Sequence, residues 1–245
     1  MRWARRSRGS ASATRSCDCS PAGFGAFAEV VCAPERCCLV PKPPELTFEQ
    51  AAALPQAGFI ALQAMRDRAA VRPGMRVLVN GAGGGAGTLA VQLAVHYGAE
   101  VTGVDGPTKQ ELMRSLGAAH VFDYTAEDFT ASDRRYDAIL DMAAHRSLFP
   151  LRRSLVPGGL YLLAGGNGKA SLQAAFLGPF LPARGGRVKY LLAATRAENL
   201  TTLAELCTAG TVRPVIDRCY PLHEAGEALG RVGRKESLGK VLIVP

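Results

Sequence analysis

The fold is decided by the stretch Val77-Leu78-Val79-Asn80-Gly81-Ala82-Gly83-Gly84-Gly85-Ala86-Gly87, in which an apolar run passes directly into glycines. After this stretch, apolar residues recur at helical spacing and form one stripe, made of Ala86, Leu89, Ala90, Leu93, Ala94 and Tyr97. A short apolar run that leads through glycines into an amphipathic segment predicts a strand, a tight turn and a helix.

Each of three glycines in this turn has a physical reason. Gly81 allows a tight turn off the strand, Gly84 lets a pyrophosphate approach the backbone, and Gly87 lets the helix pack closely on the strand. The free N–H groups at the helix start and the positive end of its dipole favour an anion. The turn therefore predicts a dinucleotide site, although the register Gly81-x-Gly83-x-x-Ala86 also fits, and a plain flexible turn is the alternative.

An acidic residue ends the next apolar run, Val101 to Asp105. A carboxylate about 20 residues after the glycine turn can accept hydrogen bonds from a ribose diol and repels a 2′-phosphate, so Asp105 favours NAD over NADP. Lys109 lies one turn further and can reach the same ribose or a phosphate. Asp105 can also cap the following helix. Methyltransferases that use S-adenosylmethionine have a similar turn and acid, but they seldom need so long a run of glycines.

The region from residue 76 onward alternates short apolar runs with helical patterns. Strands are predicted at 76–80, 100–104, 120–123, 136–141, 159–164, 188–193, 215–220 and 240–244. Helices are predicted near 84–97, 108–116, 146–154, 197–209 and 223–232. This alternation is typical of βαβ units with a parallel sheet buried on both faces, so we expect an α/β fold of the doubly wound, Rossmann type.

The segment before residue 76 differs in composition and in its pattern of apolar residues. Residues 1–22 are rich in Arg and Ser and predict a disordered leader, with a mitochondrial transit peptide as the alternative. A strand is expected at 26–31, and Thr47 and Gln50 form a capping-box pattern at the start of a helix. Pro55 interrupts that helix, and a second one is expected from about 57 to 69.

Composition narrows the classes of function. Hydrophobic residues make up 48% and charged residues 20%, which is typical of a soluble globular protein, and no uninterrupted apolar run of about 18 residues predicts a membrane span. The net charge is +8, but half of it lies in the first 20 residues, and no run of basic residues is interleaved with aromatics, so nucleic-acid binding is not expected.

Cysteine usage bears on compartment and metal binding. Seven cysteines, an odd number, without a secretory segment favour a reducing compartment, which we take as the cytoplasm. Five of them lie within the first forty residues, but their spacing matches no paired C-x2-C pattern and no histidine is near. No metal site is therefore predicted.

Several short motifs follow one another in a fixed order: 25–29 (Gly-Ala-Phe-Ala-Glu), 51–55 (Ala-Ala-Ala-Leu-Pro), 80–87, 115–118 (Ser-Leu-Gly-Ala), 121–124 (Val-Phe-Asp-Tyr), Tyr136-Asp137 with Asp141, Gly165-Gly166, 214–217 (Pro-Val-Ile-Asp) and 239–241 (Gly-Lys-Val). In this order and spacing, the chain from about Phe24 to Pro245 resembles the medium-chain dehydrogenase/reductase superfamily. Within it, the chain is most similar to the zinc-independent quinone oxidoreductase branch, which includes zeta-crystallin.

The resemblance implies NAD(P)H as cofactor, hydride transfer to a quinone or an α,β-unsaturated carbonyl, and a homodimer paired through strand 188–193. It also implies which residues border the cofactor: Gly81, Ala82, Gly83, Gly84, Gly85, Ala86 and Gly87 at the pyrophosphate, Asp105 and Lys109 at the adenosine ribose, Tyr124 and 142–144 with Ala143 at the adenine and ribose, and 163–167 with Leu163, Gly165 and Gly166 along the nicotinamide.

The chain departs from this family in several places. Members of this family begin with a GroES-like catalytic domain, of which we expect only parts in this chain. The expected division is a leader at 1–22, a remnant of the GroES-like domain at 23–55 and 211–245, and a Rossmann domain at 56–210. Because the missing part would carry most substrate contacts, the alternative function is a truncated, weakly active protein that binds NAD(P) and dimerises.

Individual residues depart from the family as well. Ile60 stands where the family has a threonine near the nicotinamide, and relatives with a small residue in place of Asp105 bind NADPH, which leaves the choice of cofactor open. The ligands of the zinc-dependent members are missing. No residue is assigned as catalytic. Tyr190 and Tyr220 are considered as general acids, but packing in the core or at an interface is the favoured role for both.

Overall fold

The computed structural model describes residues 16–18, 38–144, 148–165 and 186–244. It divides into two compact units, residues 1–59 with 194–245, and residues 60–193. The sequence predicts boundaries at 55/56 and 210/211, whereas the two units divide at 59/60 and 193/194. The helix at 197–208 therefore lies in the first unit and not with the sheet. The strand expected at 26–31 lies outside the described residues.

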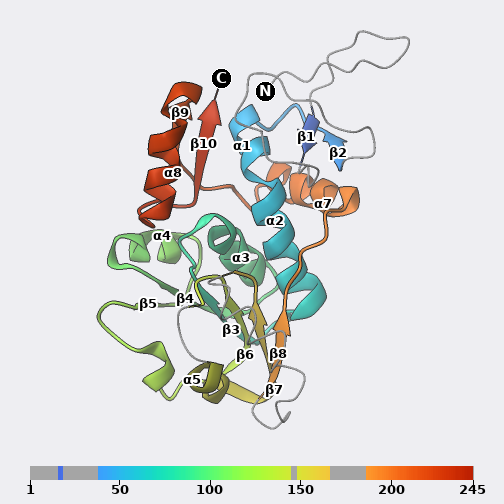
Figure 1. Cartoon of the computed structure of the whole chain (residues 1–245). Coiled ribbons are helices and arrows are strands. Elements are labelled where there is room, and N and C mark those ends of the chain that lie inside the picture. The colour runs from blue at the N-terminus through green and yellow to red at the C-terminus, as the bar shows by residue number, and fades with distance from the viewer. Residues whose placement is uncertain (1–15, 19–37, 145–147, 166–185, 245) are drawn as a thin grey trace, which may run out of the picture. The chain divides into compact units, whose positions relative to one another are not determined.

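The second unit contains a six-stranded parallel sheet with the order β5-β4-β3-β6-β7-β8 (Figure 1). Its strands are β3 (Arg76–Asn80), β4 (Glu100–Asp105), β5 (His120–Asp123), β6 (Tyr136–Asp141), β7 (Leu155–Leu163) and β8 (Arg187–Tyr190). The chain runs outward from β3 to β5 and then returns to β6 on the other side of β3. This is the doubly wound order of a Rossmann fold, as the sequence predicts, with its topological switch point between β3 and β6.

Four helices of this unit lie within the described residues, besides the end of a helix that begins in the first unit. They are the π-helix η1 (Gln63–Arg68), α3 (Gly85–His96), α4 (Gln110–Ser115) and α5 (Leu148–Arg153), with short 3-10 turns at 107–109 and 129–131. Val77, Leu78 and Val79 are all completely buried, although they alternate between the two faces of β3. Both faces of the sheet are therefore covered, which explains why its strands are apolar throughout.

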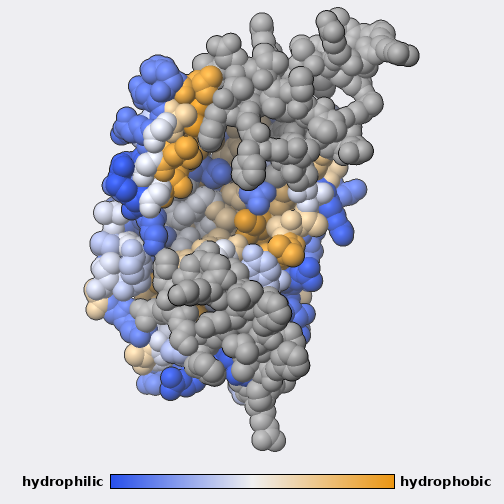
Figure 2. Space-filling model, in the orientation of Figure 1, coloured by the Kyte–Doolittle hydropathy of each residue, from blue (hydrophilic) through white to orange (hydrophobic). Residues whose placement is uncertain are grey.

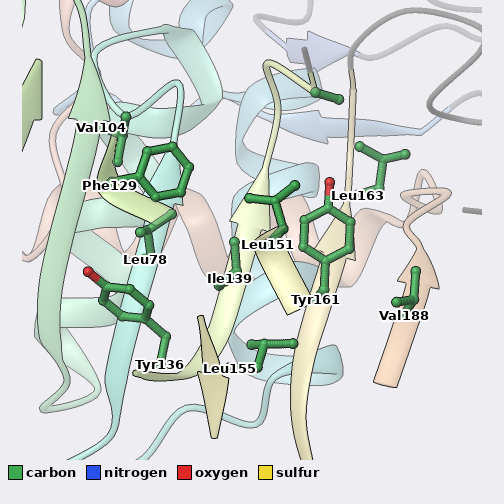
Figure 3. Packing of buried hydrophobic residues seen from close by; sticks show 11 residues of the cluster. Leu78, Val104, Phe129, Tyr136, Ile139, Leu151, Leu155, Tyr161, Leu163 and Val188 are labelled. Carbon is green, nitrogen blue, oxygen red and sulfur yellow. The ribbon is translucent and has the colours of Figure 1, made fainter. Parts of the chain in front are cut away.

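One face of this core is shown in Figure 3. Leu78, Ile139 and Tyr161 project from β3, β6 and β7 onto the same side of the sheet. Leu151 of α5 and Phe129 of the 3-10 turn pack against them. This cluster fixes the three central strands relative to one another, and hence the positions of their carboxyl ends.

The first unit contains the helices α1 (Phe48–Ala53), α7 (Ala197–Thr208) and α8 (Ala225–Gly233), and α2 (Pro55–Leu62) begins in it. Its strands form two pairs, β1 (Ser16–Asp18) with β2 (Leu39–Pro41), antiparallel, and β9 (Ile216–Pro221) with β10 (Lys240–Val244), parallel. The capping box of Thr47 and Gln50 is confirmed. Figure 2 shows apolar side chains gathered in a stripe over β10. Among the described helices, none has the length and apolar character that crossing a bilayer requires.

Candidate functional site

The candidate site lies at the carboxyl ends of β3 and β6. The glycine turn, residues 81–87, follows β3, and a second turn, residues 142–144, follows β6. β3 and β6 are neighbours, but the chain passes from β3 to β4 on one side and from β6 to β7 on the other. The loops that follow the two strands therefore separate at this point. Ligands of open α/β sheets bind in the crevice at such a switch point.

Two glycines of the glycine turn are required by the protein itself. Gly81 has φ +86°, a left-handed conformation that other residues rarely adopt. A Cβ atom on Gly87 would lie 2.1 Å from the carbonyl oxygen of Gly81 and 2.7 Å from Cα of Ala82. Since both contacts are with backbone, α3 can start this close to β3 only if residue 87 is glycine.

Gly84 is different, because no backbone strain and no close contact among the described residues requires it to be glycine. Its backbone is extended, with φ −85° and ψ 175°, and the nearest atom to a Cβ there would be the carbonyl oxygen of Gly81 at 3.4 Å, an ordinary contact. The open space lies at the N-terminus of α3, where the first N–H groups of a helix lack intrahelical partners and the dipole is positive. The space at Gly84, beside the first N–H groups of α3, therefore fits a diphosphate.

Asp105, at the end of β4, is tied into the glycine turn. Its Oδ2 accepts a hydrogen bond from the Gly83 N–H (2.9 Å), and its Oδ1 accepts one from the Gly106 N–H (2.9 Å). Lys109 Nζ lies 3.3 Å from Oδ1, and both side chains are nearly buried. The helix cap suggested for Asp105 is not seen, because Gly106 is the N-cap residue of the turn at 107–109 and no side chain caps that turn.

Lys109 also lies over the glycine turn. A Cβ atom on Gly83 would be 2.5 Å from Cδ of Lys109, so the aliphatic part of this lysine packs directly against Gly83. Tyr124 lies close by: it is 48% exposed, and its ring edge would be 3.8 Å from a Cβ on Gly106. The sequence-predicted residues Asp105, Lys109 and Tyr124 are thus brought together beside the glycine turn.

The remaining residues of the expected cofactor site are placed less uniformly. Ala143, expected with 142–144 at the adenine and ribose, is half-buried in the turn after β6. A Cβ on Gly165, in the segment expected along the nicotinamide, would be 2.8 Å from the carbonyl oxygen of Met142, so these two segments touch. Leu163 is completely buried in the core cluster, so only its backbone is available to a ligand. Gly166 lies outside the described residues.

The two tyrosines considered as general acids lie in different units. Tyr190 is 39% exposed at the end of β8, whereas Tyr220 of β9 is buried, with Arg218 above its ring. Within the described ranges, no group of three or more His, Cys, Asp or Glu residues could hold a metal ion.

A buried polar network that we did not predict lies beneath the second turn. Asp141 accepts hydrogen bonds from Asn80 and from Tyr161, on the two neighbouring strands. The signal in the sequence was an Asn and an Asp that each end an apolar strand.

The strand order, the open helix start at the switch point and the acid after β4 define a dinucleotide-binding Rossmann domain. Residues 116–243 match the family model described as zinc-binding dehydrogenase. The chain is 32% identical over 241 residues to the chloroplast envelope quinone oxidoreductase homolog of Arabidopsis thaliana, covering 91% of this chain and 70% of that protein. It belongs to the quinone oxidoreductase branch of the medium-chain dehydrogenase/reductase superfamily.

Solved structures agree with this membership. The quinone oxidoreductase from Coxiella burnetii superposes with a TM-score of 0.74 and 29% identity, over 84% of this chain and 63% of that one. An NAD-dependent alcohol dehydrogenase gives a TM-score of 0.76 and 28% identity, over 90% of this chain and 65% of that one. The chain thus spans slightly less than two thirds of the length of these two structures.

Proposed function

We propose that this chain binds NAD(P)H and catalyses hydride transfer to a quinone or an α,β-unsaturated carbonyl compound, without zinc. The observation that carries the proposal is the open space at Gly84, where neither backbone conformation nor packing explains a glycine. A bound diphosphate explains it, because a Cβ there would crowd the anion at the start of α3.

The neighbouring residues would then hold the rest of the cofactor. Asp105, Lys109 and Tyr124 form its adenosine end, with the carboxylate available to a ribose hydroxyl and the ammonium close enough to balance the carboxylate's charge. The turn at 142–144, which the resemblance assigns to the adenine and ribose, touches Gly165, so we place it with the backbone of 163–165 at the nicotinamide end. Because Lys109 offsets the charge of Asp105, we expect the chain to accept both NADH and NADPH, with NADH preferred.

The chemistry requires little from side chains. Bound NAD(P)H supplies a hydride from C4 of its nicotinamide ring. The chain holds that ring in one orientation against an electron-poor acceptor, and holding two reactants in place accounts for a large share of catalysis in such reactions. The homodimer, the cytoplasmic location and a proton-donating role for Tyr190 or Tyr220 stay predictions.

A second candidate function is cofactor binding and dimerisation with little turnover. It is favoured by one observation, that the chain spans only 63% and 65% of the two solved structures described above.

Calorimetric titration with NADH, NADPH and S-adenosylmethionine, followed by assays with a quinone and an enone, separates these functions. The proposal expects micromolar binding of NAD(P)H and its oxidation by at least one acceptor. Binding without oxidation supports the second candidate, and binding of S-adenosylmethionine in place of NAD(P)H refutes both.

A further inference from the structure

The turn after β6 is anchored by a single buried carboxylate. Asp141 is completely buried, yet its carboxylate accepts four hydrogen bonds from described residues. Its Oδ1 accepts from Nδ2 of Asn80 (2.8 Å) and from the N–H groups of Ala143 (3.0 Å) and Ala144 (2.8 Å). Its Oδ2 accepts from the hydroxyl of Tyr161 (2.8 Å). These four donors offset the cost of burying the charge.

Two of these bonds connect Asp141 to the neighbouring strands, and the other two hold the turn that follows β6. Asn80 is the last residue of β3, Asp141 the last of β6, and Tyr161 stands in β7. Figure 3 shows the Tyr161 ring between Leu151 and Leu163, with its hydroxyl pointing away from Leu155. Burial, with the Asp141 carboxylate beside it, raises the pKa of Tyr161, so the phenol stays protonated and donates.

The turn that Asp141 anchors is held in a conformation it would not adopt alone. Ala144 has φ +37°, which is unusual for a residue with a Cβ, and its N–H is one of the two that Asp141 holds. Met142 is fitted against two glycines, because a Cβ on Gly165 would lie 2.8 Å from its carbonyl oxygen and one on Gly81 would lie 3.6 Å from its Cβ. The turn therefore touches the glycine turn on one side and the end of β7 on the other.

We propose that Asp141 is a positioning residue, whose carboxylate holds the 142–144 turn at the switch point and thereby sets the placement of the nicotinamide half of the cofactor for hydride transfer. The inference rests on the proposed function. Asp141 acts through the turn and does not touch the reacting atoms. Since the adenosine end is built from Asp105, Lys109 and Tyr124 on other strands, a loosened turn affects placement of the ring more than affinity.

The test compares Asp141→Asn with Tyr161→Phe. The first keeps the size of residue 141 but replaces a charged acceptor with a weaker neutral one at the turn amides. The second removes the donor to Oδ2 and leaves the bonds to Ala143 and Ala144 in place. We expect Asp141→Asn to lower kcat at least tenfold and to increase the primary isotope effect with 4-deuterated NADH, while the Kd for NADH changes less than threefold. Tyr161→Phe should keep kcat within threefold.

Exchange of the Ala143 and Ala144 amides, followed by NMR, reports on the turn without a substrate. We expect at least tenfold faster exchange in Asp141→Asn and little change in Tyr161→Phe. If wild type binds NADH without turnover, the emission of bound NADH replaces kcat as the readout, and Asp141→Asn should move it towards that of free NADH.

The outcomes separate the two proposals. A wild-type chain that does not bind NAD(P)H overturns the proposed function and this inference together. If wild type functions and Asp141→Asn keeps its kcat, isotope effect or NADH emission, only the inference is overturned. The same holds if Tyr161→Phe loses as much as Asp141→Asn, since the network would then act through stability alone.

Discussion

Gly84 and Gly87 lie three residues apart in one turn, yet they are glycines for different reasons. At Gly87 the protein has no room for a side chain, because a Cβ would lie 2.1 Å from a backbone oxygen. At Gly84 a Cβ would meet nothing closer than 3.4 Å, and the backbone is extended. The comparison teaches that packing alone explains Gly87, whereas Gly84 is explained by its N-cap position and, as we propose, by a bound diphosphate. Substitutions at the two positions should therefore fail in different assays.

The largest effect is expected for Gly87→Ala. The added Cβ meets backbone atoms of residues 81 and 82, which cannot rotate away, so α3 has to move off β3. We expect a loss of at least about 3 kcal/mol in the free energy of unfolding, measured by chemical denaturation, or no folded protein at all. A variant as stable as wild type would contradict the close packing described here.

Gly84→Ala is expected to leave the fold intact and remove cofactor binding. Stability should change by no more than about 1 kcal/mol, since Gly84 is an N-cap residue and alanine is a poorer cap. The Kd for NADH should rise at least about a hundredfold, or about 2.7 kcal/mol, when measured by calorimetry. Unchanged affinity would remove the reason for placing a diphosphate at this turn.

Asp105 serves both the protein and the proposed ligand. Its carboxylate accepts a hydrogen bond from the Gly83 N–H, and we propose that it also accepts one from a ribose hydroxyl. Asp105→Ser should shift the ratio of NADPH to NADH affinity at least about tenfold towards NADPH, since it removes a negative charge near a 2′-phosphate. Asp105→Asn is the matched control, which keeps an acceptor for the turn. Equal ratios in all three proteins would exclude the ribose role.

Lys109→Met is expected to have the smallest effect. Methionine keeps most of the aliphatic contact over Gly83 but removes the ammonium beside Asp105. Without that charge, NADPH affinity should fall about threefold to tenfold and NADH affinity less, as fluorescence titration of the two cofactors would show. A larger loss for NADH than for NADPH would argue against a charge-balancing role.

The sheet could be predicted from sequence because its strands are short apolar runs separated by helical patterns, and local periodicity is enough to place them. The glycine turn and Asp105 could be located because their spacing along the chain is characteristic. The bond from Gly83 to Asp105 could not, since it joins residues 22 apart that meet only when β3 pairs with β4.

The Asp141 network shows the same limit more clearly. Asn80 and Asp141 are 61 residues apart and become neighbours only through the pairing of β3 with β6, which periodicity does not specify. Leu163 illustrates the reverse case. It lies in the expected segment at the end of β7, but its side chain is buried in the core, and only the three-dimensional packing decides that.

The most direct test of the account is hydrogen exchange at the amides of Gly85, Ala86 and Gly87, measured by NMR with and without NADH. These N–H groups begin α3 and should bind the diphosphate without help from side chains. We predict that saturating NADH slows their exchange at least about tenfold. Saturation with NADH that leaves these three amides unchanged would contradict the central claim.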